Sequence, residues 1–300
     1  MNWSELCSRL LPGEGKIRFP KLAIPALPDV VFKVAQKAQE PDVAVSDLGG
    51  LIETDAALTS EMLRYVNSSA MMLRHKASNA SRACALLGVK KTKLFVLTVA
   101  SNRLMNSVIS PLIVMRRFSV SSMERALFAK AVASHKKLDS DLAFSCGLLQ
   151  DLVLPTLTAD LLDHYSDFMT AVKQTGEDLA VHERNRFGWD HALAAGLIMK
   201  GWGFPDDLIS CVVMHHRLEE ILADPELAKT ELFPVAMAGL LHDLLGQSPN
   251  GCTRLQNCWS EHMTDIPLED IAEIVSQQLD ELVSERHGHV TLSEQLSMAV

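Results

Sequence analysis

The sequence predicts an all-α protein, and three observations support this prediction. Apolar residues recur three and four positions apart along most of the chain, which is the spacing of one helix face. No stretch shows a convincing alternation of apolar and polar residues, the pattern of a half-buried strand. Hydrophobic residues make up 48% of the 300 residues and the mean hydropathy is +0.11, so the helices can bury a substantial core.

The clearest helical patterns lie, in chain order, within residues 28–39, 55–67, 91–105, 123–137 and 267–283. Capping residues mark where several helices begin. A short polar side chain can accept a hydrogen bond from the free N–H groups of a first turn, and proline costs nothing there because it has no N–H group. We expect N-caps at Ser46, Asp55 and Ser119, and prolines at or near first turns at Pro28, Pro205 and Pro267.

The helices are expected to form two lobes. Residues 106–119 interrupt the helical pattern with a Ser-Pro pair before a long amphipathic helix begins. No repeat of fixed period appears, which argues against a solenoid. The expected organisation is an N-terminal segment (1–19), a smaller N-terminal helical lobe (20–107), a second helical lobe (108–250) and a C-terminal helical extension (251–300).

Charge and apolar patterning limit the classes of partner. A formal net charge of −9 argues against a protein whose main partner is the phosphate backbone of nucleic acids. No uninterrupted apolar run is long enough for a membrane span, and no basic leader precedes an apolar segment near Met1. The six cysteines form no CxxC pair and are expected to be reduced thiols. The sequence therefore predicts a cytoplasmic protein without a membrane partner.

Five residues of the second lobe have side chains suited to a metal ion. Asp151, His191, the adjacent pair His215 and His216, and Asp243 come from separate predicted helices. Imidazole and carboxylate groups bind Mn, Fe, Zn or Mg, although a lone buried histidine is more often a hydrogen-bonded core residue. Helical bundles build metal sites from inward-facing residues of facing helices, so we expect these five side chains to converge on one cleft.

Motifs in both lobes follow the pattern of a known family. The first lobe contains I-x-x-D-x-x-L-x-x-x-x-L-x-x-x-N-S, at Ile52, Asp55, Leu58, Leu63, Asn67 and Ser68, with Ala56 where the family has proline, and then A-x-x-x-L-G at Ala83, Leu87 and Gly88. In the second lobe, "FSCGLLQDLVL" falls where the family has GLLHD, and "FGWDHALAAGLIMKGWGFP" follows the family's next run. Residues 20–250 thus resemble the HDOD branch of the HD superfamily of metal-dependent phosphohydrolases, a signal-output domain of bacterial signalling proteins.

The resemblance implies a metal site, and two positions depart from it. The superfamily's catalytic pattern has a histidine on one helix, a His-Asp pair on the next, later histidines and a final aspartate around one or two ions. Here Arg125 and Ala126 stand where the first histidine belongs, and Gln150 replaces the histidine of the pair. An amide is a poor ligand beside imidazole. We interpret GLLQD as a decayed motif and expect Arg125, if it points inward, to pair with Asp151.

The family pattern leaves two functions open. The leading hypothesis is a non-catalytic signalling module, without a cofactor, that binds a partner protein or a nucleotide second messenger. The alternative is a phosphohydrolase or phosphodiesterase acting on a nucleotide or cyclic dinucleotide. Its single divalent ion (Mn, Fe, Zn or Mg) would be held by Asp151, His191, one of His215 and His216, and Asp243, the counterpart of the family's final aspartate.

Two smaller features complete the expectations. Lys90, Lys91 and Lys93 could bind phosphate at a helix start, a weaker hypothesis because a short basic run is usually a solvated helix face and the chain is acidic. Asn67, followed by two serines, is expected to make structural hydrogen bonds near a helix C-terminus.

Overall fold

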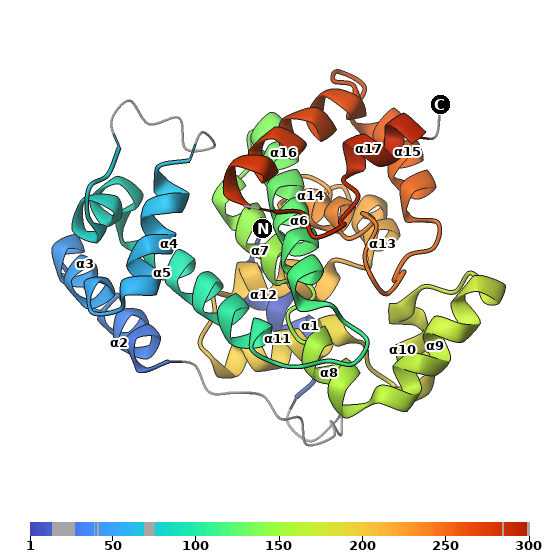
Figure 1. Ribbon diagram of the computed structural model, residues 1–300, viewed down its shortest axis with the longest axis horizontal. Helices are drawn as coiled ribbons and strands as arrows, with labels where there is room; N and C mark the ends of the chain where they lie inside the picture. Colours follow the sequence, from blue (N-terminus) through green and yellow to red (C-terminus); the bar gives the residue numbers. More distant parts are fainter. Residues whose placement is uncertain (14–27, 39, 41, 69–75, 284, 299–300) are drawn as a thin grey trace. The chain divides into compact units, whose positions relative to one another are not determined.

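Figure 1 shows the computed structural model of the protein, which describes residues 1–13, 28–38, 40, 42–68, 76–283 and 285–298. Within these ranges the regular elements are helices and no strand occurs, so the predicted all-α class is confirmed. The chain divides into two compact units, one of residues 25–104 and one of residues 1–24 together with 105–300. The boundary expected between residues 19 and 20 lies outside the described residues.

The unit of residues 25–104 consists of α2 (Asp29–Lys37), α3 (Val45–Glu53), α4 (Ala56–Val66) and most of α5 (Ala80–Asn106). α3 packs against both α2 and α4. The core of this unit includes Leu48 and Ile52 of α3 and Leu58 and Met62 of α4, and in each helix the two buried residues are four positions apart, a spacing that predicted the helices. Gly88 interrupts α5 with a φ of 78°, a left-handed value that favours glycine.

Asn67 ends α4 and ties it to a distant part of the chain. Its side-chain oxygen accepts a hydrogen bond from the backbone N–H of Ala77 (2.7 Å), and its amide donates to the backbone carbonyl of the same residue (2.9 Å). The expected structural role is therefore confirmed. The partner is the backbone ahead of α5 and not the last carbonyls of α4, a pairing that local sequence could not reveal.

The predicted helix starts were correct in most cases. Asp55 caps α4 by accepting from the Leu58 N–H group (2.8 Å), and Pro28, Pro205 and Pro267 are the residues that precede α2, α12 and α16. Ser46 and Ser119 are not N-caps. α3 already begins at Val45, and Ser119 lies inside α6, where its hydroxyl donates to the Met115 carbonyl. A serine inside a helix can bond to the preceding turn, so its presence does not fix a helix start.

The other unit contains the remaining helices: α1 (Trp3–Leu10), α6 (Met115–His135), α7 (Ser140–Leu149), α8 (Leu154–Asp160), α9 (Leu162–Thr175), α10 (Leu179–Phe187), α11 (His191–Gly201), α12 (Asp206–Met214), α13 (Leu218–Ala223), α14 (Leu232–Ala238), α15 (Gly251–His262), α16 (Leu268–Leu282) and α17 (Leu292–Met298). α1 packs against α12, and α16 packs against α6. The expected N-terminal segment and C-terminal extension thus belong to the same compact unit as the second lobe.

α6 and α7 form the buried centre of this unit (Figure 1). α6 packs against α7, α14 and α16. The two central helices approach closely at Gly147, where an added Cβ would lie 2.8 Å from the Arg125 carbonyl oxygen and 2.9 Å from the Ala126 Cα. Because Gly147 has no side chain, the end of α7 can lie beside Arg125, and this places Asp151 near it.

α11 and α12 are consecutive helices joined by a short connection, which makes them antiparallel neighbours. The two helices approach closely at Gly196, where an added Cβ would lie 2.3 Å from Val213 Cγ2. This arrangement brings the first residue of α11, His191, beside the last turn of α12 and the histidines that follow it.

All six cysteines are free thiols, as expected, and Cys252 alone among them is not buried. Among the described residues, one stretch, Ser140–Asp160, is apolar and long enough to span a membrane, but 94% of its apolar window is buried in the structure. A central helix of a folded core passes the same test of length and composition.

Candidate metal centre

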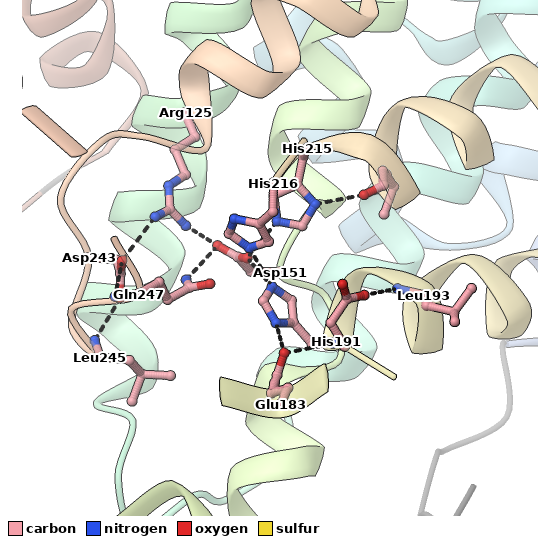
Figure 2. Close-up of polar contacts among 12 residues, drawn as sticks. Arg125, Asp151, Glu183, His191, Leu193, His215, His216, Asp243, Leu245 and Gln247 are labelled. Atoms are coloured by element: carbon pink, nitrogen blue, oxygen red, sulfur yellow. Dashed lines mark hydrogen bonds and ion pairs between the residues drawn. The ribbon is translucent and has the colours of Figure 1, made fainter. Parts of the chain in front are cut away.

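Four of the five predicted site residues come together in one group. Asp151 follows α7, His191 opens α11, and His215 and His216 follow α12. One ligand atom from each lies within 4.8 Å of the others, and the side chains face one another in Figure 2. Asp151, His191 and His215 are buried and His216 is half-buried. These four residues are the metal-ligand group.

Hydrogen bonds on the far side of two rings fix how the histidines face the group. His191 Nδ1 lies 2.7 Å from Glu183 Oε2, and His215 Nδ1 lies 2.6 Å from the Val212 carbonyl oxygen. Both of these oxygens can only accept, so each Nδ1 must carry the hydrogen. In a neutral imidazole the Nε2 atom is then the acceptor, and the Nε2 atoms of both rings lie on the side of the group where Asp151 is.

Of the four atoms that face one another, Asp151 Oδ1 and the Nε2 atoms of His191 and His215 are acceptors, and His216 Nε2 is left to donate to His191 Nε2. Asp151 Oδ1 lies 3.4 Å from His191 Nε2 and 3.5 Å from His215 Nε2, and the Nε2 atoms of His191 and His216 are 2.9 Å apart. Neither Asp151 Oδ1 nor His215 Nε2 has a hydrogen-bond partner among the described residues. Ligand atoms of a tetrahedral zinc ion at ordinary bond lengths would be about 3.3 Å apart. The four ligand atoms and their spacing therefore fit a single divalent ion.

Burial keeps the histidines in the form that binds metal. Burial, reinforced by the neighbouring His191, lowers the pKa of His215 to about 3. Burial and then the proximity of His215 lower the pKa of His216 well below its ordinary value. Both rings are neutral at physiological pH, as a metal ligand must be.

Arg125 from α6 occupies the other side of Asp151. Its guanidinium forms an ion pair with Asp151 Oδ2, donates to Asp243 Oδ2 (3.2 Å) and donates to the Leu241 carbonyl (3.0 Å). Figure 2 shows the side chain between the two carboxylates, and all three side chains are buried. The predicted pairing of Arg125 with Asp151 is confirmed. Arg125, Asp151 and Asp243 are called the arginine clamp below.

Asp243 was expected among the metal ligands, but it lies outside the group of four side chains that converge. Its oxygens accept from Arg125 and from the backbone N–H groups of Leu245 (2.7 Å) and Gln247 (3.1 Å). Asp243 therefore shares the buried cluster but belongs to the arginine clamp, because three donors already satisfy it. Its neighbour in the sequence, His242, is exposed.

Gln150 does not join the metal-ligand group. The side chain is 1% exposed, and neither its amide oxygen nor its amide nitrogen has a hydrogen-bond partner among the described residues. The residue that takes part instead is Gln247, whose amide donates to Asp151 Oδ2 (3.2 Å). Sequence reasoning missed Gln247, because a glutamine in a loop after α14 carries no local signal of its partner.

Sequence reasoning also missed Glu183. It lies on α10 in the polar run "HERNRF", which reads as an exposed helix face, yet its side chain is 1% exposed. Glu183 lies eight residues before His191, but the sequence alone does not show that its carboxylate is buried. With Asp151 and Asp243, Glu183 brings three buried carboxylates against the one guanidinium of Arg125, an excess of two negative charges that a divalent ion would balance.

The weaker phosphate-binding candidates lie elsewhere. Lys90 and Lys91 are exposed and Lys93 is half-buried, and all three belong to α5 just after the break at Gly88. They are in the unit of residues 25–104, whereas the metal-ligand group is in the other unit. Phosphate binding by these lysines stays a prediction.

A comparison against protein families identifies the family of the chain. The HDOD domain family matches residues 24–218, more than half of the chain. The chain belongs to the HDOD family. The family resemblance expected from the sequence motifs is thereby confirmed.

Solved structures share the HDOD fold at low sequence identity. An HDOD domain protein of unknown function from Geobacter sulfurreducens is 18% identical, with 98% of this chain and 92% of that chain covered and a TM-score of 0.58. A presumed metal-dependent phosphohydrolase from Shewanella amazonensis SB2B is 17% identical, with 87% and 91% covered and a TM-score of 0.66. At such identities these likenesses concern the fold.

One curated relative is an uncharacterized protein of Treponema pallidum (strain Nichols), 24% identical over 232 residues. The match covers 75% of this chain and 44% of the relative. This HDOD chain therefore spans less than half the length of that relative.

Proposed function

We propose that this HDOD protein is a regulatory module that binds one divalent metal ion, does not hydrolyse phosphoesters, and acts in signal transduction through a partner protein or a nucleotide-like ligand. The observation that carries the proposal is the arginine clamp, in which Arg125 pairs with Asp151 and Asp243. The resemblance assigns both of these carboxylates to the metal-binding pattern of catalytic relatives.

The clamp disfavours a second metal ion. A guanidinium stays protonated in proteins, so Arg125 is a permanent positive charge. It holds Asp151 Oδ2 and Asp243 Oδ2 by charge-assisted hydrogen bonds. A second divalent ion at these oxygens would have to displace Arg125 into a buried environment without a counter-charge. The two-ion arrangement of catalytic relatives is therefore disfavoured here.

The remaining group suits a structural ion better than a catalytic one. Structural zinc sites have four protein ligands, whereas catalytic sites keep a position open for water or substrate. Asp151 Oδ1 and the Nε2 atoms of the three histidines supply four ligand atoms. An ion held by all four would connect the end of α7, the start of α11 and the end of α12, and its binding energy would stabilise this packing.

A second candidate function has support of its own. The metal-ligand group contains three histidines and a carboxylate, and a structural relative from Shewanella is a presumed metal-dependent phosphohydrolase. An ion with more than four ligand positions would keep room for a water beside those donors. Hydrolysis of a nucleotide or cyclic dinucleotide phosphoester is therefore the alternative to be tested.

The deciding experiment combines metal analysis with a hydrolysis screen. We expect the purified chain to bind one zinc, iron or manganese ion and to show no metal-dependent turnover of phosphomonoesters, phosphodiesters or cyclic dinucleotides. Turnover on the order of one per second that His215→Ala abolishes would overturn the non-catalytic function in favour of the phosphohydrolase. Because His215 is in the ligand group, this variant also separates activity of the site from a contaminating enzyme.

The partner can be sought with the same protein. Thermal unfolding in the presence of cyclic dinucleotides and mononucleotides detects a second messenger that binds the folded state, because such a ligand raises the unfolding temperature. If none of these compounds shifts the transition, a partner protein is the favoured ligand. A cytoplasmic location and the absence of a nucleic-acid partner belong to the same proposal. The net charge of −9 supports the absence of a nucleic-acid partner.

A further inference from the structure

Glu183 lies behind His191 and contacts both its ring and its backbone. Glu183 Oε2 accepts from His191 Nδ1 (2.7 Å) and from the His191 backbone N–H group (2.9 Å). The histidine is the first residue of α11, so this N–H group has no partner within the helix. One carboxylate oxygen therefore holds both the ring and the helix start to which it is attached, as Figure 2 shows.

We propose that Glu183 is a positioning residue of the metal centre: it holds His191 with Nδ1 protonated and Nε2 directed at Asp151, and it adds negative charge that strengthens ion binding. This inference rests on the proposed single ion. A carboxylate behind a ligand histidine fixes the ring orientation and raises the basicity of the nitrogen that binds the metal. Glu183 and His191 are both buried, so bulk water does not reach Nδ1.

Tyr165 of α9 holds the other oxygen of this carboxylate. Its hydroxyl donates to Glu183 Oε1 (2.6 Å), and it is 2% exposed. Burial, and then the charge of Glu183, raise the pKa of Tyr165 well above its ordinary value. The phenol therefore stays a donor throughout the physiological pH range. Helices α9 and α10 thus supply a chain of hydrogen bonds from Tyr165 through Glu183 to His191, which belongs to the metal-ligand group.

Asp190 provides a matched comparison beside Glu183. It too is a buried carboxylate at the start of α11: it accepts from the Leu193 N–H group (2.9 Å) and pairs with Arg184 (2.5 Å). Its hydrogen bonds leave the His191 ring untouched. A merely structural role for Glu183 would make the two carboxylates equivalent, whereas a positioning role distinguishes them.

The test compares the full chain with three variants: Glu183→Gln, Tyr165→Phe and Asp190→Asn. Zinc affinity is measured by competition with a chelator, and the protonation of the His191 ring nitrogens by ¹⁵N NMR of the metal-free protein. We expect Glu183→Gln to weaken zinc binding by about 10-fold to 100-fold and to reduce the fraction of His191 with Nδ1 protonated. Tyr165→Phe should weaken it by a few-fold, and Asp190→Asn should weaken it less than Glu183→Gln does while lowering stability.

Two affinity results would overturn the inference: equal zinc affinity in wild type and Glu183→Gln, or an equal loss in Glu183→Gln and Asp190→Asn. If Glu183→Gln does not fold, the zinc affinity of Tyr165→Phe is the test. An unchanged zinc affinity in that variant counts against the positioning role of Glu183. The NMR measurement needs no metal. Failure of the wild type to bind zinc would therefore refute the proposed single ion, while an unchanged His191 ring in the Glu183 variant would refute the positioning role by itself.

Discussion

Asp151 has one oxygen in each half of the buried cluster, and the two halves satisfy it in different ways. Oδ2 faces the arginine clamp, where Arg125 and the Gln247 amide donate to it. Oδ1 faces the Nε2 atoms of His191 and His215 and has no hydrogen-bond partner among the described residues. One half thus contains a cation built into the chain, and the other is arranged to receive one.

The difference shows how a metal site can lose part of its function and keep its fold. Buried carboxylates need a counter-charge, and either a metal ion or a guanidinium can supply it. In the arginine clamp the counter-charge is covalently attached and permanent. In the metal-ligand group it depends on metal concentration and pH. The following predictions separate these two kinds of stabilisation.

The largest effect is expected from removing the built-in cation. Arg125→Ala leaves Asp151 Oδ2 and Asp243 buried without their guanidinium and should lower the free energy of unfolding by about 3–5 kcal/mol. Urea unfolding of the metal-free protein measures it. The control is Arg286→Ala, since Arg286 also pairs with two carboxylates, Asp280 and Glu294, but on the surface, where the loss should be about 0–1 kcal/mol. Equal losses would show that burial of the clamp does not matter.

The next effect concerns the exchangeable cation. Zinc at about one hundred times its dissociation constant should stabilise the wild type by about 2.7 kcal/mol relative to the protein in EDTA. His215→Ala should lose this gain because it removes one ligand of the group. His242→Ala, a change at an exposed histidine next to Asp243, should keep it. The comparison fails if both variants respond to zinc alike.

Mildly acidic pH should lower the free energy of unfolding of the protein when the metal-ligand group holds no ion. The pKa of His215 is about 3 in the folded protein, and an ordinary histidine titrates near 6.5, so between these values the unfolded chain binds a proton that the folded chain does not. Stability is therefore lost as the pH falls below about 6.5, by up to about 1.4 kcal/mol per pH unit. Urea unfolding at several pH values measures the slope, and His215→Gln should remove this contribution. An unchanged slope in that variant would contradict the prediction.

The smallest effect is expected at Gln150. Gln150→His restores the family's His-Asp pair in sequence, yet Arg125 still holds Asp151 Oδ2, so no phosphohydrolase turnover should appear. The variant is compared with Gln150→His combined with Arg125→His, for bound manganese or iron and for turnover. Robust metal-dependent turnover by the single variant would mean that the arginine clamp does not block catalysis.

Much of the site could be predicted from the sequence because its signals are local or follow chain order. Helical periodicity predicted the all-α class, and Asp55 caps its helix as a short acidic side chain should. The order of Asp151, His191 and the two histidines after α12 matched the family pattern, and the fold brings all four together. The pairing of Arg125 with Asp151 followed from charge and from the absence of a histidine at that position.

Only the tertiary structure decided which of these groups are satisfied, because this depends on partners distant in the chain. Asp243 leaves the ligand group since Arg125, Leu245 and Gln247 supply its donors. The polar residues around Glu183 in the sequence suggest an exposed side chain, but Glu183 is buried and accepts a hydrogen bond from His191. Sequence determined which side chains could bind a metal ion or carry charge. Packing determined which lone pairs remained without a donor, since desolvation and hydrogen bonding are set by the whole surroundings of an atom.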